Sequence, residues 1–128
     1  MEANTKVSVL MSLYIKEKPE YLKAAMDSVL AQTYPIDEIM LIEDGPLTEE
    51  LYDLVNEYQS KNANIRIFAF EQNQQLGRAL AKGVELCSNE LVARMDTDDI
   101  AMPDRIEKQV AYMEADHLHR SGIRRRMP

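Results

Sequence analysis

Strand-like runs alternate with amphipathic helical stretches along almost the whole chain, and this alternation restricts the fold more than any other feature. Strands that are joined through helices form right-handed crossovers and therefore a parallel sheet. We predict a single α/β domain with a mainly parallel sheet of about four strands and flanking helices on both faces. A flavodoxin-like or receiver-type domain is the alternative fold, but it places its acid cluster at early strands. The strands are expected at residues 7–13, 38–44, 65–70 and in the short apolar run between Glu90 and Asp96.

Four helices are expected between and after these strands. Pro19 suits the first turn of the first helix, and Thr48 can cap the second. The fourth begins after Pro103. In the third, we expect the apolar positions to face inward and both glycines to allow close packing, because glycine costs a helix about 1 kcal/mol. The positions concerned are Leu76, Gly77, Ala79, Leu80, Gly83 and Val84.

The last predicted strand ends in three carboxylates within four residues, Asp96, Asp98 and Asp99. Ligands of an open α/β sheet bind beyond the carboxyl ends of its strands. Crowded carboxylates repel one another unless a cation compensates them, and hard divalent cations take oxygen ligands together with phosphates. This stretch predicts a metal–diphosphate site. The alternative is a polar turn in which Asp99 caps the next helix.

A second acid, Asp44, follows the second predicted strand, so a parallel sheet would bring it to the same edge. Its carboxylate could accept a hydrogen bond from a nucleotide base or a ribose. Tyr14, after the first strand, could stack on a base. The alternatives are a turn residue before Gly45 and a boundary aromatic, respectively.

The charge distribution argues against nucleic acid as a partner. Four of the 15 Lys and Arg residues lie in the stretch 117–128, which has no acid, so the preceding chain carries 11 cations against 22 Asp and Glu. Such a surface repels nucleic-acid phosphates. The stretch 116–128 is interpreted as a basic tail, either an interaction tail or a segment that is foreign to the domain or disordered.

Sequence features that mark compartments point to the cytoplasm. No apolar run approaches the roughly 20 residues of a membrane span, and no signal-peptide pattern is present. The single cysteine, Cys87, excludes an internal disulfide. Neither a dinucleotide-binding nor a P-loop glycine pattern occurs.

Four ordered motifs together resemble the nucleotide-binding half of family-2 inverting glycosyltransferases, which have the GT-A fold with a Rossmann-like sheet. The resemblance covers residues 6–115 approximately. It implies transfer of a sugar from a nucleotide-diphosphate sugar, most often a UDP-sugar, with Mn²⁺ or Mg²⁺. The motifs are Val7-Ser8-Val9-Leu10-Met11-Ser12-Leu13-Tyr14, Ser28-Val29-Leu30-Ala31-Gln32-Thr33-Tyr34-Pro35, Ile42-Glu43-Asp44-Gly45, and Met95-Asp96-Thr97-Asp98-Asp99 followed by Met102-Pro103-Asp104-Arg105.

The resemblance also implies roles for individual residues. The base would lie against the ends of the first two strands, and the ribose, diphosphate and metal against the acid triplet. The sequence departs from the family pattern in three places: Gln75 stands where Gly is usual, Ala81 where Asn is usual, and Glu43 where Asp is usual. The implied nucleotide-binding residues are Ser12, Tyr14, Asp44, Asp96 and Asp98, and the implied metal ligands are Asp98 and Asp99.

The resemblance leaves the catalytic base unassigned, because in this family that carboxylate lies in a C-terminal half. We therefore expect residues 1–115 to be the donor-binding domain of a longer enzyme, inactive alone. The expected acceptor is a saccharide or lipid-linked glycan of polysaccharide or cell-envelope synthesis, with the full protein cytoplasmic or peripheral to the inner membrane face. A non-catalytic nucleotide-binding module and a nucleotidyltransferase are the alternatives; the latter would need a Gly-rich basic loop near the first strand. A dehalogenase-type phosphatase would carry its Asp-x-Asp motif on the first strand instead.

Overall fold

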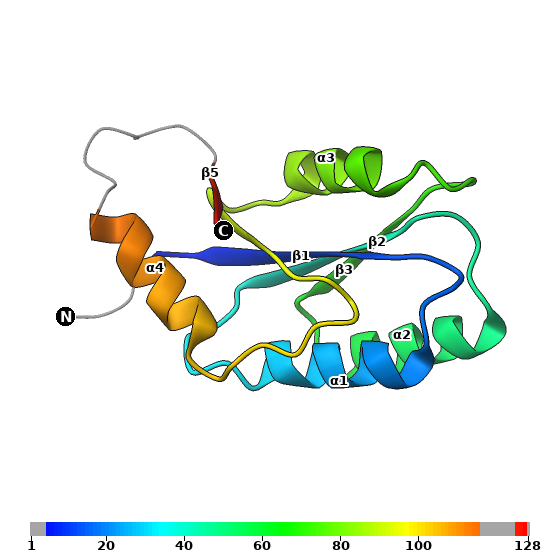
Figure 1. Ribbon diagram of the computed structural model, residues 1–128, viewed down its shortest axis with the longest axis horizontal. Helices are drawn as coiled ribbons and strands as arrows, with labels where there is room; N and C mark the ends of the chain where they lie inside the picture. The colour runs from blue at the N-terminus through cyan, green and yellow to red at the C-terminus, as the bar shows by residue number, and fades with distance from the viewer. Residues whose placement is uncertain (1–4, 116–124, 128) are drawn as a thin grey trace.

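The computed structural model describes residues 5–115 and 125–127 and has a five-stranded, fully parallel sheet in the order β3-β2-β1-β4-β5. Figure 1 shows α3 on one side of this sheet and α1 and α2 on the other. The strands are β1 Val7–Leu13, β2 Glu38–Glu43, β3 Ile65–Ala69, β4 Leu91–Arg94 and β5 Arg125–Met127, and the helices are α1 Pro19–Leu30, α2 Glu49–Lys61, α3 Leu76–Leu86 and α4 Arg105–Ala115.

The central strand β1 divides the core into two layers, because alternate side chains of a strand point to opposite faces. Val9 and Met11 belong to the larger layer, which includes apolar side chains of α1, α2 and α4. Leu10 belongs to the smaller layer under α3. A Cβ added at Gly83 would come within 2.2 Å of Leu10 Cδ1, so this glycine lets α3 approach the sheet closely, as predicted.

The predicted α/β fold is confirmed, and its four strands are those that the apolar runs indicated. Thr48 caps α2 as predicted, since its hydroxyl accepts a hydrogen bond from the Leu51 N–H at 3.1 Å. Two expectations for α3 are wrong: Leu76 is 50% exposed, and no atom lies within 4 Å of a Cβ built at Gly77. Both residues belong to the first turn of α3.

One strand was not predicted. β5 pairs in parallel with β4, and it lies in the basic stretch 116–128. The remainder of that stretch, 116–124 and Pro128, lies outside the described residues, so its interpretation as a foreign tail stays a prediction. Among the described helices, none combines the length and apolar character needed to cross a membrane.

A buried carboxylate at the amino-terminal edge of the sheet accepts hydrogen bonds from several neighbouring elements. Glu38, at the start of β2, accepts hydrogen bonds from Ser8 Oγ at 2.6 Å, from Ser88 N at 2.8 Å and from Ser88 Oγ at 3.0 Å. Arg66 of β3 also donates to it and forms an ion pair. This one side chain thus connects β1, β2, β3 and the turn before β4.

Candidate functional site

A cleft of about 450 Å³ opens at the carboxyl edge of the sheet, at the point where the chain order reverses. There β1 has β2 on one side and β4 on the other, so the loops that leave these strands diverge. Open α/β sheets bind ligands at this position. The cleft is lined by Ser12, Tyr14, Glu17, Asp44, Asn73, Gln75, Leu76, Asp96, Thr97 and Asp98.

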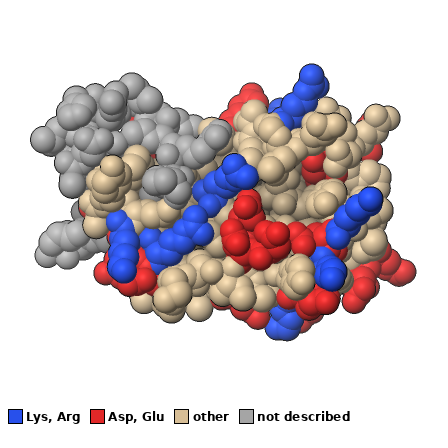
Figure 2. Space-filling model, viewed as in Figure 1, with Lys and Arg blue, Asp and Glu red and all other residues tan. Residues whose placement is uncertain are grey.

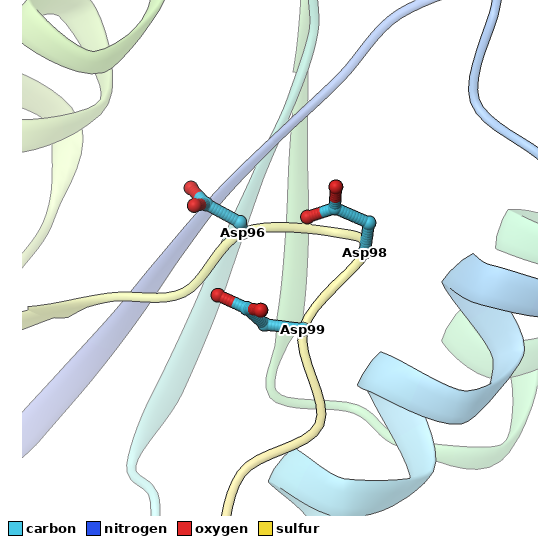
Figure 3. A group of neighbouring side chains, drawn as sticks. All are labelled: Asp96, Asp98 and Asp99. Atoms are coloured by element: carbon cyan, nitrogen blue, oxygen red, sulfur yellow. The ribbon is translucent and has the colours of Figure 1, made fainter.

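The acid triplet forms a compact group of exposed oxygen ligands on the loop after β4. Ligand oxygens of Asp96, Asp98 and Asp99 all lie within 4.8 Å of one another, and Figure 3 shows all three leaving the same stretch of backbone. Arg94 Nε forms an ion pair with Asp96 at 3.4 Å. Among the described residues, the carboxylates of Asp98 and Asp99 have no hydrogen-bond or ion-pair partner.

The triplet is a turn, but Asp99 does not cap a helix. The Asp99 N–H donates to the Asp96 carbonyl at 3.1 Å, which closes the turn. Helix α4 begins only at Arg105, too far along the chain for Asp99 to reach its first N–H groups. The capping alternative is therefore excluded, and these carboxylates remain available to a ligand.

The loop after the triplet is held by contacts that its own sequence does not indicate. Ser28 and Gln32 of the α1 region bind its backbone: Ser28 Oγ accepts from Ala101 N at 3.0 Å, and Gln32 Nε2 donates to Met102 O at 2.7 Å. Gln32 Oε1 also accepts from Ile106 N at 2.9 Å. Ser28 and Gln32, at the end of α1, thus bind the loop between β4 and α4, which is called the acid loop below.

Asp44 lines the cleft, but its carboxylate also organises the neighbouring loop. The residue is 4% exposed, and its Oδ1 accepts from the Gln74 N–H at 2.6 Å. Asn73 Nδ2 donates to its Oδ2 at 3.3 Å. Gly45 has φ +93°, and a Cβ there would lie 2.8 Å from Asn73 N, so the two loops touch through backbone. Asp44 therefore serves as a turn residue and as part of the cleft wall.

Gln75 has a backbone conformation that ordinarily requires glycine. Its φ is 73° and its ψ 160°, and it lines the cleft directly before α3. Glycine adopts this geometry without steric cost, which agrees with the glycine that the family resemblance implies at this position. The exposed Leu76 follows it along the cleft wall.

Both residues predicted at the end of β1 line the cleft. Tyr14 is 46% exposed, so its ring is available for stacking, and Ser12 lies beside it. Glu17 and Thr97 also line the cleft, and sequence reasoning did not single them out. The contact between them gives no pattern in the sequence, because the two residues are 80 positions apart.

The cleft is strongly acidic. Four carboxylates line it: Glu17, Asp44, Asp96 and Asp98. Figure 2 shows acidic side chains gathered in the middle of the face that carries the loop between β4 and α4. An anionic ligand entering this cleft needs a cation to offset the repulsion, and clustered carboxylate oxygens suit Mg²⁺ or Mn²⁺.

The family model for glycosyl transferase family 2 matches residues 8–125 of this chain. The chain belongs to this family. It is 47% identical over 108 residues to the amylovoran biosynthesis glycosyltransferase AmsE of Erwinia amylovora, covering 84% of this chain and 40% of AmsE. It is 39% identical to an Escherichia coli UDP-Gal:α-D-GlcNAc-diphosphoundecaprenol β-1,3-galactosyltransferase, covering 84% of this chain and 39% of that enzyme.

A solved mannosyltransferase structure has the same fold. The Pyrobaculum calidifontis mannosyltransferase PcManGT, in complex with GDP-Man and Mn²⁺, superposes with a TM-score of 0.74 at 17% identity. That match covers 84% of this chain and 32% of PcManGT. The chain thus spans about two fifths of the length of the two curated relatives and one third of this structure.

Proposed function

We propose that this chain provides the donor-binding site of a glycosyltransferase that moves a sugar from a UDP-sugar to a saccharide or lipid-linked acceptor. The observation that carries the proposal is the juxtaposition of an exposed aspartate triplet with a cleft at the switch point of the sheet. The names of the relatives support it, because one is a glycosyltransferase of amylovoran biosynthesis and the other is a galactosyltransferase that pairs UDP-Gal with a GlcNAc-diphosphoundecaprenol acceptor.

The cleft residues form two groups, one suited to a nucleotide base and one suited to a diphosphate with its metal ion. Tyr14 offers a ring face to a base, and Ser12 offers a hydroxyl beside it. Asp44 can accept a hydrogen bond from a base N–H with the lone pairs that Gln74 and Asn73 leave unused. These three residues form the base side of the cleft.

The acid triplet forms the diphosphate side. Asp98, which lines the cleft, would bind the ribose and the metal ion, Asp99 would bind the metal ion, and Asp96 would support both. A bound Mn²⁺ or Mg²⁺ would offset the negative charge of the diphosphate. The Mn²⁺ in the PcManGT complex supports this choice of ion. No residue of this chain is proposed as the catalytic base.

A titration of the chain with UDP, with and without Mn²⁺, tests the proposal. We expect calorimetric binding of UDP that requires Mn²⁺ and that uridine, which lacks the diphosphate, does not reproduce. UDP binding that is equally strong without the metal would favour the alternative, a non-catalytic nucleotide-binding module. Absence of UDP binding in the presence of Mn²⁺, with the chain folded by circular dichroism, would overturn the proposal.

A further inference from the structure

A hydrogen bond connects the two sides of the cleft. Thr97 lies between Asp96 and Asp98, and its hydroxyl donates to Glu17 Oε1 at 2.5 Å. Glu17 belongs to the loop between β1 and α1, on the other side of the cleft. The same hydroxyl lies 3.5 Å from the carbonyl oxygen of Ser12.

Glu17 is in turn fixed to the base side. Its N–H donates to the Tyr14 carbonyl at 3.0 Å, so Tyr14 and Glu17 close one turn. The carboxylate of this turn reaches Thr97, and the ring of Tyr14 stays 46% exposed in the cleft. One short path of hydrogen bonds therefore joins the proposed stacking residue to the acid loop.

Thr97 is buried between two exposed aspartates, and this position gives its side chain a different role from theirs. Thr97 is 5% exposed, whereas Asp96 and Asp98 on either side of it are exposed. The exposed Asp98 and Asp99 have no partner among the described side chains. The buried hydroxyl of Thr97, between Asp96 and Asp98, connects this loop to the β1–α1 loop through its hydrogen bond to Glu17. A hydrogen bond to an ionised acceptor is stronger than one between neutral groups.

We propose that Glu17 is a positioning residue for the nucleotide site: through Thr97 it holds the aspartate loop in the geometry that receives the metal and the diphosphate. The inference rests on the proposed function. Acids that repel one another would otherwise spread apart in the empty site, and a loop that is already ordered loses less entropy when the ligand binds. Glu17 itself does not need to touch the ligand for this role.

The competing interpretation is that the bond merely attaches the β1–α1 loop to the sheet. Both interpretations predict some loss of stability when the bond is removed. They differ in the affinity of the folded protein for its ligand, so the deciding measurement is the Mn²⁺-dependent affinity for UDP, corrected for the folded fraction.

The test uses paired substitutions in the 128-residue chain. Thr97→Val removes the hydroxyl at nearly constant shape, and Glu17→Ala removes the acceptor. We expect each to weaken Mn²⁺-dependent UDP binding roughly tenfold, the size of one hydrogen bond to a charged group. Thr97→Ser keeps the donor, so it should retain affinity within about threefold of the parent. Glu17→Gln keeps an acceptor but loses its charge, so it should weaken binding less than Glu17→Ala does.

The double variant and a control complete the design. Glu17→Ala combined with Thr97→Val should weaken binding no more than either change alone, because both remove the same bond. Glu20→Gln, at an exposed glutamate in the first turn of α1, should bind as the parent does. If Thr97→Val does not fold, the comparison of Glu17→Ala with Glu17→Gln carries the test.

The outcomes separate this inference from the proposed function. A parent chain that does not bind UDP with Mn²⁺ refutes the proposed function. A parent that binds, with Glu17→Ala unchanged in affinity, refutes the positioning role alone. Additive losses in the double variant would also refute it, because the two residues would then act separately.

Discussion

Glu38 and the acid triplet lie at opposite edges of the sheet, and their carboxylates have opposite environments. At the amino edge, Glu38 is 5% exposed and receives hydrogen bonds from two serines and an arginine. At the carboxyl edge, the Asp98 and Asp99 carboxylates are exposed and, within the described chain, have no partner. A carboxylate whose oxygens all bind protein donors stabilises the fold, whereas one left without donors is available to a ligand.

The contrast extends to proton affinity. Burial would raise the pKa of Glu38, but hydrogen bonds from Ser8, Ser88 and Arg66 outweigh this and leave its pKa lowered. Burial alone raises the pKa of Glu43, at the far end of the same strand. The difference teaches that partners, and not burial, decide whether an ionised carboxylate stabilises this protein.

The largest effect is expected from removing the amino-edge carboxylate. Glu38→Ala leaves the buried Ser8 hydroxyl and the exposed Ser88 without this acceptor, and the half-exposed Arg66 without its ion-pair partner, so we expect the free energy of unfolding at pH 7 to fall by about 2 kcal/mol. Urea denaturation measures this. Glu57→Ala removes an exposed i,i+4 pair with Lys61 and is the control, with a loss of at most about 0.5 kcal/mol. Equal losses in the two variants would break the comparison.

The acid loop should behave in the opposite manner. Asp99→Asn is expected to weaken Mn²⁺-dependent UDP binding tenfold or more while leaving the melting temperature of the empty protein unchanged or slightly higher, because a repulsion is lost. Calorimetry and thermal denaturation measure the two effects. Unchanged metal-dependent affinity would exclude Asp99 as a ligand, and the exposed Asp53→Asn serves as the control.

A smaller effect on stability, a gain, is expected from replacing Gln75, the strained residue of the cleft. Gln75→Gly should raise the free energy of unfolding by about 1 kcal/mol, because glycine adopts φ 73° and ψ 160° without the steric cost that glutamine bears. Thermal denaturation measures the gain. Gln75→Ala keeps the Cβ and should give no such gain. A stability loss in the glycine variant would contradict the strain argument.

The smallest effect concerns Glu43. Its raised pKa means that the folded state binds a proton more readily than the unfolded state, so this contribution to stability is present below the unfolded pKa and lost as pH rises through the folded value. Glu43→Gln should therefore raise stability at pH 7 by less than about 1 kcal/mol and leave it nearly unchanged at pH 4. Denaturation curves at both pH values test this. A uniform change at the two pH values would contradict it.

Local patterns in the sequence predicted most of the fold and the location of the site. Apolar periodicity identified four strands and four helices, and the acids at two strand ends identified the edge where the cleft lies. These features succeed because they depend on residues that are near one another in the chain. The strand β5 was not predicted, because Arg125–Met127 lacks an apolar pattern and becomes a strand through pairing with the neighbouring β4.

What could not be predicted depends on contacts between distant residues. Gln32 and Met102 are 70 residues apart, and Thr97 and Glu17 are 80 apart, so no spacing in the sequence connects them. The positive φ of Gln75 likewise has no local signature, because glutamine rarely adopts it. The choice between a capping and a ligand-binding Asp99 needed the observed start of α4 at Arg105.

The position of β1 between β2 and β4 has a consequence for the order of folding. The pairing of Val9 with Ile39 closes one crossover, whereas the pairing of Val7 with Leu91 must wait until two further crossovers have been synthesised. Pairings between residues distant in sequence form slowly, because closing the longer loop costs more entropy. We expect β1, β2 and β3 to associate first and the cleft to appear only when β4 joins them. In a refolding experiment, the ability to bind nucleotide would then arise in the last kinetic phase, after most of the circular dichroism signal has returned.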